Sequence, residues 1–233
     1  DWFNKLKHQT NQNIHSLEEY ENIIQQYLDK FSEAGCQLAD HSLDSGYEFD
    51  IPSEDKANKI FKNWMDNASL SKRELNQLRN YLLFFLSKEY AKRGWVLQLH
   101  VGAQRHTSSR LRRLAGPTGG YATMGNSCDI EGLCSFFDEL EKVGSLPKII
   151  LYTLNPVDYE AFATITGSYA QDGLSGKIQF GPPWWFNDHY EGIKRHLNIH
   201  TSYGILSQFI GMTTDSRSVF SFSRHEYFRR VLC

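Results

Sequence analysis

A carboxylate and a guanidinium stand two residues apart near the end of the sequence, at Asp215 and Arg217. They follow a short apolar run, Phe209 to Met212, which is typical of a buried strand. In an α/β barrel the loops after the carboxyl ends of the strands converge and carry the chemistry. The pair would suit metal binding or acid/base catalysis beside an anion clamp. The alternative is that Asp215 caps the next helix and Arg217 pairs with it on the surface.

Strands and helices alternate along the chain before this pair. Ser16 with Glu19 and Ser71 with Glu74 have capping-box spacing and predict helix starts, and Gly94 predicts a helix end. The expected strands lie near residues 36–41, 95–101, 148–152, 176–181 and 209–212, with helices at 16–35, 71–94, 131–143, 155–165 and 189–201. This rhythm is typical of βαβ units with a parallel sheet.

Two segments interrupt the alternation. Residues 42–71 form a polar insertion with one amphipathic helical piece over Glu54–Asp66. The segment from Gly102 to Gly125 is rich in Gly and Arg and shows no obvious secondary structure. A loop of that length in a compact domain is usually functional or disordered.

Composition narrows the class of protein. The chain has 233 residues, 40% of them hydrophobic, and a formal net charge of −2. This length allows a single barrel-sized domain, and the charge gives no reason to expect a nucleic-acid partner. No apolar run is long enough for a membrane span, and the spacing of the four cysteines favours reduced thiols. We expect a soluble, cytoplasmic enzyme or binding domain.

Several blocks of sequence carry a resemblance to a known family. They are Leu97–Ala103, Leu146–Pro156, Gly176–Gly181, Trp184–Asp188, Leu206–Met212, Thr214–Ser218 and Arg224–Arg230. In this order and spacing they resemble the uronate (glucuronate) isomerases of the amidohydrolase superfamily. The resemblance implies an α/β fold, a (β/α)₈ TIM-type barrel of which residues 1–233 resemble about strands four to eight. The family's metal-binding His-x-His pair has no counterpart here, so we expect a fragment of a longer enzyme.

The resemblance also assigns roles to individual residues. Asp215 corresponds to the family's metal-ligating aspartate, which also accepts a proton from the substrate, and Arg217 to its active-site arginine. His100 corresponds to a histidine at the end of the fifth barrel strand that faces the substrate. The cofactor implied is a divalent metal, with zinc the expected ion and Asp215 its ligand.

Four further residues are candidates for substrate binding, and each has an alternative. His41 follows Asp40 at the end of an expected strand, where Asp40 could instead only orient its imidazole. Trp184 and Trp185 would form an apolar wall against a sugar ring, or belong to the core. Arg105 makes the long loop cationic together with Arg110, Arg112 and Arg113, which suits an anionic substrate, although charge runs usually face solvent.

The function implied by the resemblance is aldose–ketose isomerisation of hexuronates: D-glucuronate with D-fructuronate, and D-galacturonate with D-tagaturonate. Such a site needs a group that acts as acid and base, and cations that stabilise the negative charge developing on the substrate oxygen. The partner is then a small-molecule hexuronate in a homo-oligomeric enzyme, without nucleic acid or membrane. Two alternatives stay open: a metal-dependent hydrolase of the same superfamily, which would use His100 as a metal ligand, and an inactive fragment.

Overall fold

The computed structural model describes residues 2–66, 68–117, 119–213, 215–216 and 218–233. The chain separates into two compact units. The first consists of Asp1–Gln37, Glu48–Trp95 and Ser135–Leu146, and the second of Leu38–Tyr47, Val96–Cys134 and Pro147–Cys233. The expectation of one barrel domain over residues 1–233 stays a prediction. None of the helices in the described part of the chain is long and apolar enough to cross a bilayer.

The first unit is helical. It contains α1 (Trp2–Thr10), α2 (Leu17–Glu33), α3 (Glu54–Met65), α4 (Lys72–Arg93) and most of α6 (Ile130–Lys142). The apolar faces of α1 to α4 meet in its core, as the helical spacing predicts for all but α1, and Ile14 from the segment between α1 and α2 joins them. The buried residues are Phe3, Leu6, Ile14, Leu17, Ile23, Ala57, Ile60, Phe61 and Leu78.

The predicted helix ends are confirmed. The Ser16 hydroxyl accepts from the Glu19 N–H at 3.1 Å, and Ser71 with Glu74 forms a complete capping box. Gly94 ends α4 with φ +69°, a conformation that glycine adopts without strain. Because these signals are local, they are readable without knowledge of the fold.

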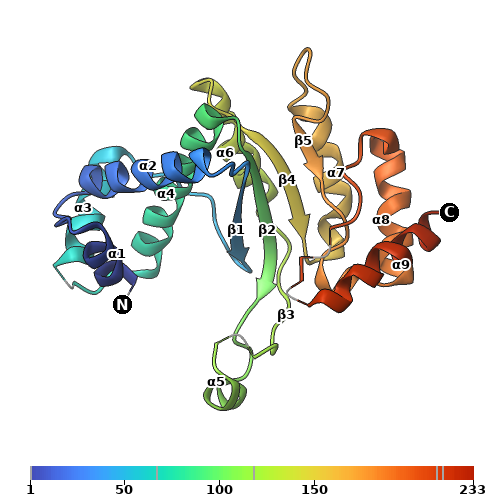
Figure 1. The fold of residues 1–233 in the computed structure, drawn as a ribbon, viewed down its shortest axis with the longest axis horizontal. Coiled ribbons are helices and arrows are strands. Elements are labelled where there is room, and N and C mark those ends of the chain that lie inside the picture. Colours follow the sequence, from blue (N-terminus) through green and yellow to red (C-terminus); the bar gives the residue numbers. More distant parts are fainter. Residues whose placement is uncertain (1, 67, 118, 214, 217) are drawn as a thin grey trace. The chain divides into compact units, whose positions relative to one another are not determined.

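The second unit is built on a parallel sheet (Figure 1). Its strands β1 (Leu38–Asp44), β2 (Val96–Gln104), β4 (Lys148–Thr153) and β5 (Ile178–Phe180) pair in chain order, and the short β3 (Thr123–Met124) runs antiparallel to β2. The unit also holds α5 (Ser109–Ala115), α7 (Tyr159–Ser168), α8 (Tyr190–Tyr203) and α9 (Ser223–Leu232). The predicted parallel order is thus confirmed for four strands.

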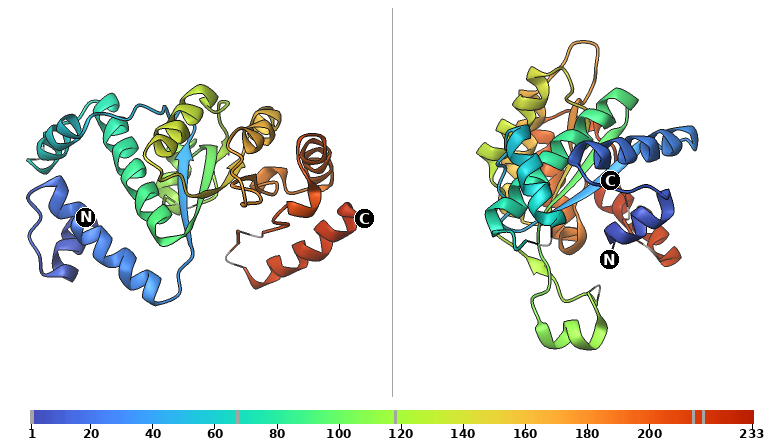
Figure 2. Two further views of the ribbon diagram at one scale, coloured as in Figure 1. Left: turned by 90° about the horizontal axis from the view of Figure 1, so that it is seen from above. Right: turned by 90° about the vertical axis from the view of Figure 1, so that its left-hand side faces the viewer.

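The expected fifth parallel strand at Phe209–Met212 is wrong. A 3₁₀ turn at Leu206–Gln208 leads into an irregular segment, in which Gly211 has φ +83°. Phe209 and Met212 instead pack against the cluster of Ile193, Leu197 and Phe228 on α8 and α9, which lie side by side in both views of Figure 2. The run is apolar because it covers two helices, and a four-residue run does not distinguish this from strand burial.

The segment 102–125 is more ordered than the sequence indicates. β2 continues to Gln104, and α5 and β3 follow, with α5 lying away from the sheet (Figure 1). A bulge interrupts β2: Leu43 pairs with Val101, and Asp44 with Ala103, which leaves Gly102 as an extra residue at φ +92°. The extra residue places Ala103 on the same sheet face as His100, because side chains otherwise alternate between faces.

Candidate functional site

His100 is the centre of the polar groups on this face of the sheet. It lies on β2, and Asp40 lies on the neighbouring β1, with 2.7 Å between His100 Nδ1 and Asp40 Oδ1. A carboxylate only accepts hydrogen bonds, so Nδ1 carries a hydrogen and Nε2 is left as the acceptor of the neutral ring. Nε2 is buried and has no hydrogen-bond partner among the described residues. The imidazole is therefore oriented, with one nitrogen available.

Two aromatic rings hold the imidazole of His100 in place. Tyr152 of β4 stacks on it with 4.2 Å between ring centroids, and Trp184 lies at 4.6 Å on a tilted plane. Tyr152 fits because Gly181 has no side chain: a Cβ there would come within 2.6 Å of the tyrosine ring. The Tyr152 hydroxyl donates to Gln98 Oε1 at 2.8 Å.

The Tyr152 hydroxyl stays protonated at neutral pH. Burial raises the pKa of Tyr152 to about 12, and the negative charges of Asp40 and Asp215 act in the same direction. The group can donate a hydrogen bond at this site, but it is a poor base.

Asp215 reaches the same place from the irregular segment before α9. Its Oδ2 accepts from Trp184 Nε1 at 3.1 Å and lies 3.8 Å from His100 Nε2. The two residues that the family resemblance singles out thus lie close together. Asp215 caps neither of the helices that follow: Ser218 caps the 3₁₀ helix Val219–Phe222, and the N-cap position of α9 is Phe222, so the capping alternative is wrong. Arg217 lies outside the described residues.

Arg105 follows β2 and is held by β1. Its Nε donates to Asp44 Oδ1 at 2.9 Å and its Nη2 to Ser42 Oγ at 3.0 Å. The guanidinium also lies over the ring of Trp185, 5.7 Å from the ring centroid. Asp40, Ser42 and Asp44 are alternate residues of β1, so one face of this strand orients both His100 and Arg105.

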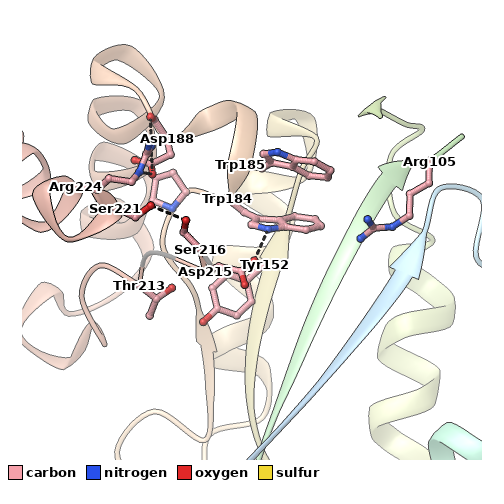
Figure 3. Close-up of a pocket in the computed structure, with 11 residues that line it drawn as sticks. Arg105, Tyr152, Trp184, Trp185, Asp188, Thr213, Asp215, Ser216, Ser221 and Arg224 are labelled. Carbon is pink, nitrogen blue, oxygen red and sulfur yellow. Dashed lines mark hydrogen bonds and ion pairs between the residues drawn. The ribbon is translucent and has the colours of Figure 1, made fainter. Parts of the chain in front are cut away.

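These groups border a cavity of about 570 Å³ (Figure 3). Trp184 and Trp185 form one wall, with Arg105 on one side of them and the pair Arg224–Asp188 on the other. The residues that line the cavity are Arg105, Tyr152, Pro183, Trp184, Trp185, Asp188, Thr213, Asp215, Ser216, Ser221 and Arg224. Its size suits a small molecule, and its polar groups include cations, carboxylates and hydroxyls.

The sequence-based placement of His41 is wrong. β1 extends to Asp44, so His41 lies within the strand, and alternation turns it to the face opposite Asp40. Burial lowers the pKa of His41, against the opposing effect of Asp40. His41 is not among the residues that line the cavity, and we no longer assign it to substrate binding.

Sequence reasoning missed Asp40 as the partner of His100, and it gave Tyr152 no role. The alternation of polar residues at positions 40, 42 and 44 could have indicated the role of Asp40, because it marks one polar face of a strand. Tyr152 had no comparable signal: its stacking on His100 depends on the pairing of β2 with β4.

Comparison with known proteins defines the family. A family model described as glucuronate isomerase matches residues 1–233. The chain belongs to this family. Curated relatives named uronate isomerase include that of Caldanaerobacter subterraneus subsp. tengcongensis, 39% identical over 232 residues, and that of Salmonella arizonae, 40% identical over 233 residues. Each match covers 100% of this chain and 50% of the relative, so the chain spans about half the length of these family members.

Solved structures of the family share the fold. The uronate isomerase of Thermotoga maritima superposes with a TM-score of 0.89 at 31% identity, over 99% of this chain and 49% of that one. The glucuronate isomerase of Caulobacter crescentus gives a TM-score of 0.85 over 98% of this chain and 46% of that one, and at 24% identity it supports the fold alone.

The residues at this site fit part of a metal-binding set. Zinc lies about 2.0–2.2 Å from imidazole nitrogen and carboxylate oxygen, so two such ligands of one ion are separated by at most about 4.2 Å. His100 Nε2 and Asp215 Oδ2, at 3.8 Å, meet that limit, so both could hold an ion in a hydrolase-type site, whereas Asp215 alone would hold it where Nε2 accepts a hydrogen from the substrate. The described residues include no group of three His, Cys, Asp or Glu suited to a metal, so a complete set needs further ligands.

Proposed function

We propose that the protein is a uronate isomerase that interconverts D-glucuronate with D-fructuronate and D-galacturonate with D-tagaturonate. The observation that carries the proposal is the glucuronate isomerase match over residues 1–233. Supporting it, the residues that the family resemblance singles out, His100 and Asp215, lie 3.8 Å apart beside a cavity of suitable size.

The reaction moves one proton from C2 to C1 and one from the C2 hydroxyl to the C1 oxygen, through an enediolate. We assign the first transfer to Asp215, whose carboxylate takes the proton from C2 and returns it at C1. The indole N–H of Trp184 holds that carboxylate in place. We assign the second transfer to His100: its Nε2, kept as an acceptor by the hydrogen bond from Nδ1 to Asp40, takes the proton of the C2 hydroxyl and returns it to the C1 oxygen.

Two groups are assigned to the negative charge that develops on the substrate oxygens. Arg217, two residues after Asp215, carries the fork of donors that suits such oxygens bidentately. A divalent cation, zinc in our proposal, would be held by Asp215 and would supply Lewis-acid polarisation of a substrate oxygen. The neutral Tyr152 and the indole of Trp184 cover one side of this region and exclude water from it.

A metal-dependent hydrolase of the same superfamily is the competing function. It would use His100 as a metal ligand, and usually a second histidine at the end of the next strand. β4 ends there with Thr153, whose hydroxyl donates to the buried Asp158 at 3.0 Å. This residue is engaged in local structure, which favours the isomerase.

The experiment is to follow D-glucuronate and D-galacturonate by NMR with the full-length protein and added Zn²⁺ or Mn²⁺. We expect the ketose signals of D-fructuronate and D-tagaturonate, and with D-glucuronate deuterated at C2 we expect that deuterium to appear at C1. If neither sugar is converted with either metal, the isomerase function is rejected. Release of p-nitrophenol from p-nitrophenyl acetate would then favour the hydrolase function. The resemblance also supports a cytoplasmic homo-oligomer, which light scattering of the same protein would test.

A further inference from the structure

Tyr152 contacts both strands of the sheet that bear the polar groups of this site. It is the register partner of His100 in the pairing of β2 with β4, and the two rings are stacked with 8° between their planes. Gln98 lies two residues before His100 and therefore on the same face of β2. Because the Tyr152 hydroxyl donates to Gln98 Oε1 at 2.8 Å, the tyrosine is fixed to β2 at its ring and at its hydroxyl.

The same hydroxyl also contacts the segment that carries Asp215. The Thr213 side chain forms a hydrogen bond with it, and this bond opposes the rise that burial causes in the pKa of Tyr152. Since the hydrogen of the tyrosine goes to Gln98, Thr213 is the donor and the Tyr152 oxygen is the acceptor. Figure 3 shows the hydroxyl of Tyr152 on the side of Thr213. The hydroxyl thus joins β2 to the segment before α9.

This segment depends on side-chain contacts for its shape. In the part that the structure describes, the residues from Phe209 to Asp215 form neither strand nor helix, and Asp215 has φ +42°. A residue other than glycine keeps such a conformation only where its surroundings fix it. Phe209 and Met212 pack on α8 and α9, but Met212 lies three residues before Asp215. Thr213 is nearer, and its hydrogen bond ties the segment to the sheet beside His100.

The hydrogen bonds of Tyr152 favour a positioning role over a catalytic one. Its hydrogen is committed to Gln98, and its oxygen accepts from Thr213. With a pKa of about 12 the hydroxyl does not ionise at neutral pH. Tyr152 therefore acts through the two groups that it holds, and not on the sugar.

We propose that Tyr152 sets the distance between the two groups assigned to proton transfer: its ring fixes the imidazole of His100, and its hydroxyl, through Thr213, fixes the turn that presents Asp215. The distance concerned is the 3.8 Å between His100 Nε2 and Asp215 Oδ2. The inference rests on the proposed function, because it takes these two groups as the ones that move protons. In it Tyr152 and Thr213 are positioning residues.

The first test is Tyr152→Phe, which keeps the ring on His100 and removes only the hydroxyl. In the full-length, metal-loaded protein we expect kcat for D-glucuronate to fall about 10- to 100-fold with little change in KM, since a misplacement of about 1 Å at a reacting group costs up to about 10²-fold. Tyr159→Phe is the matched control. Tyr159 is a buried tyrosine of α7 whose hydroxyl has no partner among the described residues, so this variant should keep the wild-type kcat.

Thr213 supplies variants at the other end of the bond. Thr213→Val keeps the size of the side chain and removes the donor, so it should lower kcat as Tyr152→Phe does. Thr213→Ser keeps the hydroxyl and should retain most of kcat. The double variant of Tyr152→Phe and Thr213→Val should lose no more than Tyr152→Phe alone, because both changes remove the same hydrogen bond. Losses that multiply in the double variant would show two independent structural effects and overturn the inference.

Crystal structures of the wild type and the two single variants, without substrate, give a readout that does not depend on activity. In Tyr152→Phe and Thr213→Val we expect the distance between His100 Nε2 and Asp215 Oδ2 to depart from 3.8 Å, while the hydrogen bond between His100 and Asp40 stays. If Tyr152→Phe is unfolded by circular dichroism, the Thr213 variants decide by the same measurements.

The outcomes separate the inference from the proposed function. An active enzyme in which Tyr152→Phe and Thr213→Val keep the wild-type kcat, or in which the distance is unchanged, overturns the inference and leaves the isomerase standing. A wild-type protein that converts neither D-glucuronate nor D-galacturonate overturns the isomerase, and the distance in the variants still decides whether Tyr152 positions the two groups.

Discussion

Two buried histidines of the sheet unit have similar local contacts and different surroundings. His100 is 6% exposed and His196 is fully buried. In each ring one nitrogen has a partner at 2.7 Å: Asp40 for His100, and the Gly181 carbonyl for His196. In each ring the other nitrogen has no partner within the described residues.

The surroundings decide what each ring can do. His196 is enclosed by aromatic groups, with the Phe180 centroid at 4.3 Å and those of Tyr159 and Phe209 within 6 Å, and burial lowers its pKa to about 3. His100 lies between the carboxylates of Asp40 and Asp215. Apolar rings around His196 disfavour a positive charge on it. The polar surroundings of His100 suit the proton transfer that we propose for it, whereas the surroundings of His196 suit a structural role.

The largest effect is expected from Asp215→Asn. The amide keeps the shape of the side chain but loses the basicity and the charge that favours a metal, so D-glucuronate turnover should fall by roughly 10²- to 10⁴-fold. Turnover and metal content would be measured in the full-length enzyme, with His225→Gln on α9 as a control expected to keep normal turnover. If the Asp215→Asn variant turned over D-glucuronate like the wild type, the region of His100 and Asp215 would have no catalytic role to set it apart from the region of His196.

A smaller effect is expected from Asp40→Asn. The variant removes the charge that orients His100, and loss of a carboxylate that holds a functional histidine in place typically costs about 10- to 100-fold in activity. We expect the loss in kcat with little change in KM, because Asp40 contacts His100 and is not among the residues that line the cavity. Asp40→Glu should recover part of kcat. A change confined to KM would show that Asp40 contributes to substrate binding instead.

The third prediction concerns stability and the region of His196. Because its folded pKa is about 3, below the ordinary 6.5, the unfolded chain binds the proton first as the pH falls. The contribution of His196 to the free energy of unfolding is therefore present above pH 6.5 and is lost progressively toward pH 3. The loss is on the order of 2 kcal/mol between pH 6.5 and 5. Burial lowers the pKa of the neighbouring His200 too, so His200 adds to the loss.

Urea unfolding at pH 7.5, 6.5, 5.5 and 5 would measure this dependence. His196→Gln should be less stable at pH 7.5 and should show a flatter dependence on pH. If the free energy of unfolding of the variant fell as steeply with decreasing pH as that of the wild type, titration of other groups would account for the acid sensitivity.

Local signals in the sequence predicted much of the fold. The capping residues Ser16 and Ser71 depend only on contacts three residues away, and they are placed as expected. The segment Phe209–Met212 was misassigned because its apolar residues satisfy either a sheet or a pair of helices. α5 was missed because its apolar residues mark no buried face: Leu114 is 74% exposed.

The candidate site was predictable where a residue belongs to a sequence block that carries the family resemblance. His100 and Asp215 are residues that family resemblance identifies, and both lie at the site. His41 and Asp40 were confused because the strand was expected to end at His41, and an error in strand boundary hides which residues share a face. The partners of Arg105, Asp44 and Ser42, lie on β1, some 60 residues earlier in the chain, and no local sequence pattern predicts this contact.

The bulge at Gly102 makes the spacing of the site sensitive to insertion and deletion. His100 and Arg105 are an odd number of residues apart, so a regular strand would direct them to opposite faces. The one extra residue in β2 is what brings both to the same side. Deletion of Gly102 would leave His100 and Asp40 paired while it turned Arg105 away from the cavity. The common face of His100 and Arg105 thus depends on this single residue of β2.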